Sequence, residues 1–164
     1  GLTGGQLRLT ILITSVLVIH GMAEAKGLDL ILSDGPPGIG CPVISALSGN
    51  DLAIIVTEPT VSGRHDLERV LELCKHFKIP AGVIINKCDL NQEQAEGIEA
   101  YCKEHQLSFI GKLPHLTAFT EAMIRGLTIT EFSSNGVRES IKTIWDNILK
   151  LAAPKPVLDR AADD

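Results

Sequence analysis

A carboxylate and several glycines lie close together in the stretch LILSDGPPGIG, which covers residues 30–40. Asp34 ends an apolar run, where a carboxylate can reach a Mg²⁺ ion, usually through water because Mg²⁺ dehydrates reluctantly. Gly35, Gly38 and Gly40 follow, and glycine lets backbone N–H groups approach a phosphate closely. A turn-capping aspartate in a Gly/Pro-rich turn that binds nothing has the same residue types. The stretch therefore indicates either a phosphate and metal site or an ordinary strand-to-helix turn.

A second polar group, NKCD at residues 86–89, directly follows the apolar run AGVII. The Asn86 amide offers both a donor and an acceptor, which suits a purine edge, and Lys87 can lay its stem over a ring. Asp89 can accept from an exocyclic amine or cap the next helix, although Asn91 is the better cap and leaves Asp89 to a ligand. Because NKCD lies 52 residues beyond Asp34, on a strand of the same kind, the pair favours a nucleotide site.

Apolar runs and amphipathic segments alternate along the chain. The expected strands are Leu28–Ser33, Asp51–Thr57, Ala81–Ile85 and Ser108–Ile110. The expected helices are Pro42–Leu47, Gly63–Lys78, Asn91–His105, Thr117–Arg125 and Ser134–Leu151, with Trp145 on the buried stripe of the last. This alternation predicts the α/β class, with a mostly parallel sheet flanked by helices.

The carboxyl ends of parallel strands hold the ligands of such sheets. We therefore expect Asp34 and Asn86 to face one cleft, from adjacent or near-adjacent strands. Glu58 also follows a strand, and the interpretation we favour for Thr60 and Ser62 is a loop that leads into a helix.

We divide the chain into three segments: an N-terminal apolar segment at residues 1–27, the main domain at residues 28–153 and a flexible tail at residues 154–164. The structure of residues 1–27 is the hardest to predict. The β-branched residues near the N-terminus favour a strand, whereas a helix commonly precedes a buried strand, and both alternatives stay open. The apolar stretch Leu9–Ile19 is shorter than the roughly 20 residues of a membrane-spanning helix, so no transmembrane segment is expected. This stretch could instead cover a sheet edge by pairing with a second copy in a homodimer.

Composition limits the function classes. The 164 residues fit one domain, and a net charge of −5 with interspersed signs argues against nucleic acid as the main partner. The four cysteines have neither zinc-site nor iron–sulfur spacing: Cys41, Cys74, Cys88 and Cys102. Three of them lie within apolar patterns, so buried free thiols in a reducing cytoplasm are expected. No G-x-S-x-G motif supports a hydrolase or amidotransferase triad.

From Leu28 to about Trp145, the motifs DGPPGIG, TEPTVSG and NKCDLN resemble the C-terminal half of MinD/ParA-type P-loop ATPases. The resemblance is closest to MinD-superfamily ATPases with an inserted ferredoxin domain. It implies that Asp34 is the Walker B or switch II acid on Mg²⁺, and that Gly38 is the switch glycine near the γ-phosphate.

The same resemblance assigns the base-binding residues. Asn86 would read adenine with Lys87 and Asp89 beside it, and the Leu113-Pro114 loop would close over the base. His115 stands where relatives usually carry an acid.

The sequence departs from this family because it contains no G-x-x-x-x-G-K-[ST] motif and no ferredoxin-type cysteine run. We therefore expect a cytoplasmic ATPase fragment that needs ATP and Mg²⁺ in the complete protein and is inactive alone. Iron–sulfur clusters would belong to the missing insert and not to this chain, and an iron–sulfur protein would be a partner. The alternatives are a non-catalytic binding or dimerisation module on the same fold and, with less support, a cobyrinic acid diamide synthase-related enzyme.

Overall fold

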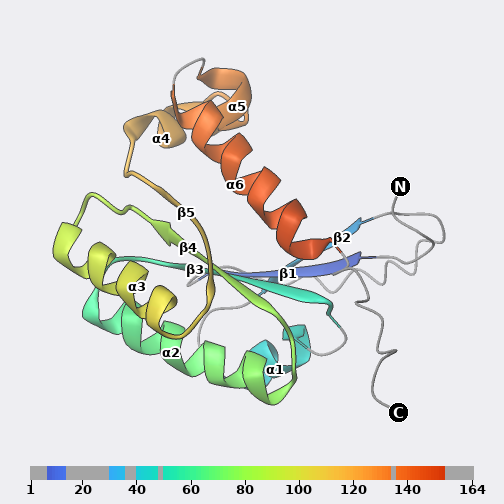
Figure 1. Cartoon of the computed structure of the whole chain (residues 1–164). Coiled ribbons are helices and arrows are strands. Elements are labelled where there is room, and N and C mark those ends of the chain that lie inside the picture. Colours follow the sequence, from blue (N-terminus) through green and yellow to red (C-terminus); the bar gives the residue numbers. More distant parts are fainter. Residues whose placement is uncertain (1–6, 14–29, 36–39, 48–49, 134–135, 154–164) are drawn as a thin grey trace, which may run out of the picture.

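One five-stranded parallel sheet organises the described part of the chain (Figure 1). The structure, a computed structural model, describes residues 7–13, 30–35, 40–47, 50–133 and 136–153. The strand order is β2-β1-β3-β4-β5, and every neighbouring pair is parallel. This sheet confirms the predicted fold class. The strands are β1 Leu7–Ile13, β2 Leu30–Gly35, β3 Leu52–Thr57, β4 Ala81–Asn86 and β5 Ser108–Leu113.

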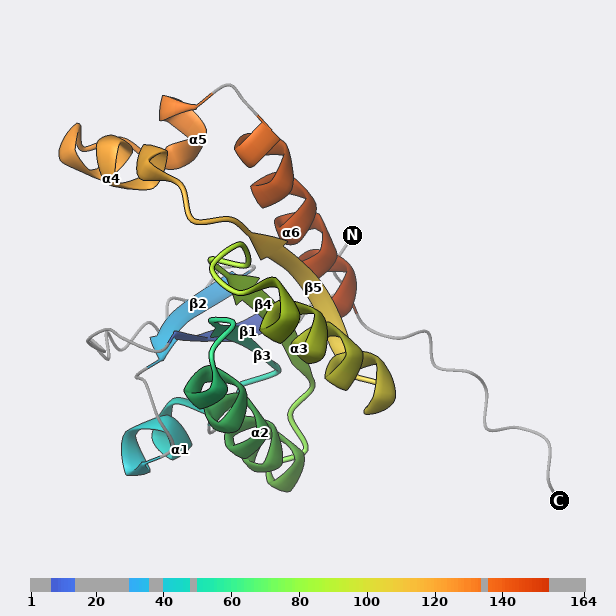
Figure 2. The same ribbon diagram turned by 90° about the vertical axis from the view of Figure 1, so that its left-hand side faces the viewer.

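Helices cover both faces of the sheet, as a parallel sheet requires. Figures 1 and 2 show α1 (Cys41–Leu47), α2 (Val61–His76) and α3 (Gln92–Glu104) on one face and α6 (Gly136–Ala152) on the other. Successive residues of β3 alternate between the two cores, because neighbouring side chains of a strand point to opposite faces. Ala53 and Ile55 pack in the α1–α3 core, whereas Leu52 and Ile54 pack in the α6 core.

Residues 7–13 form a strand and not a helix, the two alternatives that the sequence left open. β1 pairs with β2 on one side and with β3 on the other, so it lies inside the sheet. The proposed pairing of the Leu9–Ile19 stretch with a second copy is therefore wrong for residues 9–13, because their backbone groups are already paired on both sides. Residues 14–19 lie outside the described part of the chain.

Tertiary packing changes two of the predicted elements. β5 continues to Leu113, with a register irregularity opposite Val83/Ile84 and with Gly111 so close to α6 that a Cβ would lie 2.7 Å from Ile144 Cγ1. Trp145 is 37% exposed, which corrects its place on the buried stripe of α6, where Ile144 and Ile148 are the buried residues.

A short helix was not predicted. α5 (Ile129–Phe132) follows α4 (Thr117–Ile124) and begins with a capping box between Thr128 and Glu131. Among the described residues, no helix is long and apolar enough to cross a membrane.

Candidate nucleotide site

The polar residues of NKCD lie at the carboxyl end of β4, beside the end of β5. Asn86 is the last residue of β4 and pairs in register with Leu113, the last residue of β5. The Cys88 N–H donates to the Leu113 carbonyl over 3.0 Å, which continues the pairing beyond the strands. The structure thus brings Asn86, Asp89, Leu113 and Pro114 to one rim, which we call the β4/β5 rim and define by residues 86–89 and 113–115.

A carboxylate joins the two sides of this rim. The backbone N–H of His115 donates to Asp89 Oδ1 over 2.6 Å. This bond holds the pKa of the exposed Asp89 carboxyl below its usual range, because the N–H stabilises the charged form. Asp89 is therefore less free than expected, since one of its oxygens binds this chain's own backbone.

Asn86 differs from the other asparagines in the described part of the chain. Asn50 Nδ2 donates to the Ala46 carbonyl, Asn91 caps α3, and Asn147 Nδ2 donates to the Ile110 carbonyl over 3.0 Å. The half-buried Asn86 side chain makes no hydrogen bond to any described residue. An amide without an internal partner at a strand end remains available to a ligand.

Lys87 has a partner that the sequence did not suggest. Its Nζ lies 2.7 Å from Glu58 Oε1, at the end of the neighbouring strand β3, and its backbone has a positive φ of 53°. In this structure the Lys87 ammonium group therefore points to Glu58, and a stem lying over a base stays a prediction.

Glu58 belongs to a loop that the start of α2 holds tightly. Thr57 Oγ1 donates to the Gly63 carbonyl over 3.0 Å, and Thr60 caps α2 by accepting from the Gly63 N–H. A Cβ at Gly63 would lie 2.5 Å from the Glu58 carbonyl oxygen, so only glycine fits. The interpretation of Thr60 as part of a loop leading into a helix is confirmed.

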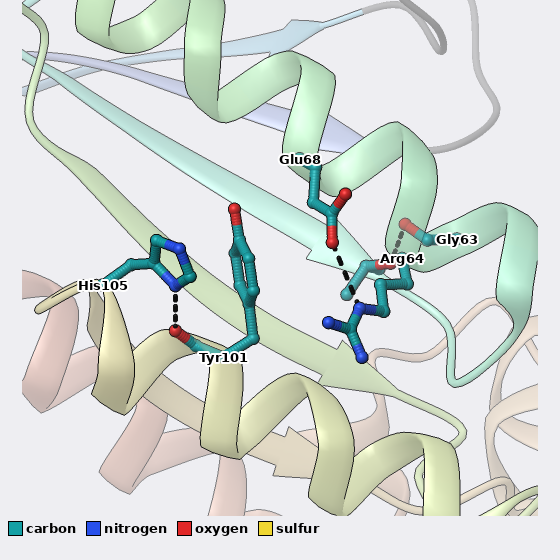
Figure 3. Close-up of polar contacts among 6 residues, drawn as sticks. Gly63, Arg64, Glu68, Tyr101 and His105 are labelled. Carbon is teal, nitrogen blue, oxygen red and sulfur yellow. Dashed lines mark hydrogen bonds and ion pairs between the residues drawn. The ribbon is translucent and has the colours of Figure 1, made fainter.

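A cluster of polar and aromatic side chains joins α2 to α3 (Figure 3). The Arg64 guanidinium lies 5.5 Å from the ring centroid of Tyr101 and its Nε is 3.1 Å from Glu68 Oε1. The His105 ring stacks at a tilt on Tyr101, with 4.0 Å between the ring centroids. These contacts hold together the two helices that begin just after the Glu58 loop and the NKCD segment.

Asp34 lies in β2, the strand at one end of the strand order and far from β4 and β5. It is exposed, and β1 and β3 separate β2 from β4, so the expectation of adjacent or near-adjacent strands is wrong. The register pairs Asp34 with Ile11, Ile11 with Ile54, and Ile54 with Gly82. Asn86 lies four residues further along β4 than Gly82. Three inter-strand steps alone amount to about 14 Å. Asp34 and Asn86 thus share no contact, and only an extended ligand could reach both.

The remaining residues are one predicted residue that the structure does not describe and two partners that the sequence did not predict. Gly38 lies outside the described residues. Glu58 and the His115 backbone were not predicted as partners of Lys87 and Asp89; the available signal was their position directly after strands β3 and β5. Within the described part of the chain, no group of three or more His, Cys, Asp or Glu side chains could hold a metal ion.

A parallel sheet covered by helices on both faces, with polar residues after its strands, is the doubly wound type of α/β fold, whose ligands bind at the carboxyl ends of the strands. Residues 13–149 match the family ParA, described as NUBPL iron-transfer P-loop NTPase. The match covers most of the chain, which therefore belongs to this family of P-loop NTPases.

Individual relatives agree with this assignment. The uncharacterized protein MJ0578 of Methanocaldococcus jannaschii is 40% identical over 79% of this chain and 43% of its own length. The cytosolic Fe-S cluster assembly factor Nubp1 homolog of Drosophila pseudoobscura pseudoobscura is 31% identical over 74% of this chain and 45% of its own. The chain thus spans less than half the length of either relative.

A solved structure shares the fold. The septum site-determining protein MinD of Pyrococcus horikoshii, in complex with Mg-ADP, superposes with a TM-score of 0.66 at 22% identity. The superposition covers 78% of this chain and 53% of MinD. It supports the fold alone.

Proposed function

We propose that these residues form the base-reading and switch half of a domain that binds a purine nucleoside triphosphate with Mg²⁺. The observation that carries the proposal is the half-buried Asn86 amide, which has no partner among the described residues and lies on the β4/β5 rim. An amide presents a donor and an acceptor together and can pair with the edge of a purine. The family relationship suggests ATP as the nucleotide.

The metal end of the proposed site is Asp34. Magnesium commonly takes one or two carboxylates and completes its shell with water and phosphate oxygens. The exposed Asp34 carboxylate fits that role, and the ion would neutralise charge on the phosphates. We assign Gly38 to the phosphate end only by its resemblance to the switch glycine.

The phosphate-binding loop of such a site is not among these residues. The 164 residues contain no G-x-x-x-x-G-K-[ST] motif, so they lack the backbone cradle and lysine of that loop. We propose that a complete protein hydrolyses ATP and serves iron–sulfur cluster assembly, as the name of the Nubp1 relative suggests.

Calorimetric titration with ATP–Mg²⁺ tests this division of the site. The 164-residue chain should bind weakly, and a longer chain that adds a G-x-x-x-x-G-K-[ST] half should bind at least 100-fold more tightly, since the phosphate contacts contribute several kcal/mol. Tight binding by the short chain would contradict the half-site proposal. Absence of binding by the longer chain would favour the non-catalytic module.

A further inference from the structure

Lys87 has a backbone conformation that residues with a Cβ rarely adopt. Its φ is 53°, in the left-handed region, where the Cβ comes close to the following carbonyl oxygen. In the described part of the chain, two other residues besides glycines share a positive φ, Lys78 and Gln106. Each directly follows the C-cap of a helix, Phe77 of α2 and His105 of α3, where a left-handed residue is common. Lys87 follows a strand, so no helix end explains its conformation.

The ion pair with Glu58 fixes the far end of the Lys87 side chain. Lys87 Nζ lies 2.7 Å from Glu58 Oε1, and the two side chains are 36% and 34% exposed. Pairs of this exposure change an equilibrium constant by about two- to fivefold, because water and salt screen them in part. The pair therefore favours the Lys87 conformations in which Nζ can reach Glu58.

Glu58 belongs to a loop whose backbone is held at several points. Pro59 follows it, is fully buried, and restricts the backbone of the residue before it. The Glu58 carbonyl accepts from the Thr60 N–H over 2.8 Å, and it lies so close to Gly63 that a Cβ there would be 2.5 Å away. Loss of the ion pair should therefore free Lys87 more than it displaces Glu58.

The turn at Lys87 sets the direction of the chain at the end of β4. Asn86 precedes the turn as the last residue of that strand, and after it the Cys88 N–H donates to the Leu113 carbonyl over 3.0 Å. A rotation of Lys87 out of the left-handed region would change the path of the backbone between Asn86 and Cys88. Such unusual conformations persist only where the surrounding contacts hold them, and they cluster at functional sites.

We propose that Glu58 is a positioning residue of the nucleotide site. Through its pair with Lys87 it holds the left-handed turn, and the turn fixes the place of the Asn86 amide on the β4/β5 rim. The inference rests on the proposed function and adds how the base-binding end of that site is held. Asn86 contacts the base, whereas Glu58 acts on this contact from the end of β3 and couples the loop before α2 to it.

Amide hydrogen exchange of the 164-residue chain, followed by nuclear magnetic resonance, tests the turn without any nucleotide. The variant Glu58→Gln keeps the shape of the side chain and removes its charge, so the Cys88 amide should exchange about threefold faster. High salt should raise the wild-type Cys88 rate, relative to the other amides, to that of the variant, because salt screens the pair. The matched control is Glu68→Gln, which breaks the 3.1 Å pair with Arg64 on α2 and should leave the Cys88 rate unchanged.

Calorimetric titration of the longer chain with ATP–Mg²⁺ tests the action through Asn86. Glu58→Gln should bind about threefold more weakly than the wild type, which is the same factor as in the exchange experiment. In a chain that already carries Asn86→Ala, Glu58→Gln should cost no further affinity, because the amide through which it acts is gone. Glu68→Gln should keep the wild-type affinity. A merely structural role of Glu58 would instead lower the urea midpoint and give losses of affinity that add.

The possible results separate this inference from the proposed function. An unchanged Cys88 rate in Glu58→Gln overturns the role of the pair in holding the turn, and so does a wild-type rate that salt leaves unchanged, a comparison that stands even if the variant fails to fold. Additive losses of affinity overturn the action through Asn86. These results leave the nucleotide site intact. No binding of ATP–Mg²⁺ by the longer wild-type chain overturns the proposed function, and the positioning role with it.

Discussion

Some side chains at the β4/β5 rim bond this chain's own atoms, and one makes no hydrogen bond to the described residues. The Asp89 Oδ1 and the Lys87 ammonium group bind this chain's own atoms, over 2.6 and 2.7 Å. The Asn86 amide binds none of the described residues. Since the Asn86 amide makes no hydrogen bond to the described residues, its removal should cost the fold little, which makes Asn86 the clearest test of the proposed site.

Asn86→Ala should lower the affinity for ATP–Mg²⁺ about tenfold in the calorimetric titration of the longer chain, because two hydrogen bonds to the base are lost. The free energy of unfolding in urea should change by less than about 0.5 kcal/mol. The matched control is Asn147→Ala, which removes the 3.0 Å bond to the Ile110 carbonyl. That variant should lose about 1 kcal/mol of stability and keep its nucleotide affinity. The opposite pattern would show that Asn86 is structural.

At the scale of elements, the start of α2 determines where the Glu58 loop lies. Thr60 caps the helix, Thr57 donates to the Gly63 carbonyl, and the missing Cβ of Gly63 lets the loop backbone approach. Because the Lys87 ammonium group pairs with Glu58, a shift of this loop would reach the β4/β5 rim.

Gly63→Ala should destabilise the protein by about 1–3 kcal/mol, because its Cβ would lie 2.5 Å from the Glu58 carbonyl oxygen and the backbone would have to move. Gly97→Ala on α3 is the matched control. Its Cβ would meet nothing nearer than Arg64 Nη1 at 3.6 Å, so the better helix propensity of alanine should stabilise by about 0.5–1 kcal/mol. Denaturant midpoints measure both. Similar changes in the two variants would contradict the close approach at Gly63.

At the scale of the whole molecule, the described part of the chain packs in two hydrophobic cores, one on each face of the sheet. Two thiols lie in the α1–α3 core: Cys74 and Cys102 are each 1% exposed, and burial raises the pKa of both to about 11. Cys41 is exposed and Cys88 is half-buried, so the expectation of buried free thiols is confirmed for the two core cysteines.

Alkaline pH should therefore weaken the fold. Each core thiol has a higher pKa in the folded protein than the value near 9 in the unfolded chain. Its contribution to the free energy of unfolding is therefore fully present below pH 9 and is lost as the pH rises toward 11, because the unfolded chain loses its proton first. Each thiol accounts for about 2 kcal/mol of lost stability by pH 11. Urea midpoints at pH 8 and pH 10.5 measure the loss, and the variant Cys74→Ala/Cys102→Ala should show a smaller pH dependence. The same slope in both proteins would assign the loss to other groups.

Local pattern was enough to predict most elements of this protein. Buried strands such as β3 and β4 are apolar on both faces, and α2 and α3 carry apolar residues at spacings of three and four, so their sequences identify them. The caps at Thr60 and Asn91 are equally local, because each bonds a backbone N–H three residues ahead. The resemblance of DGPPGIG and NKCD to a P-loop NTPase also lies in the sequence, and the family match confirms it.

Only the tertiary structure decided which strands are neighbours. Local periodicity does not encode strand order, so the sequence left β1 open between strand and helix and placed Asp34 and Asn86 too near each other. The pairs Lys87–Glu58 and Asp89–His115 join residues far apart in sequence, which meet because parallel strands end at one rim. The sequence thus determines which polar groups follow the strands, and the crossovers between strands determine which of these groups meet.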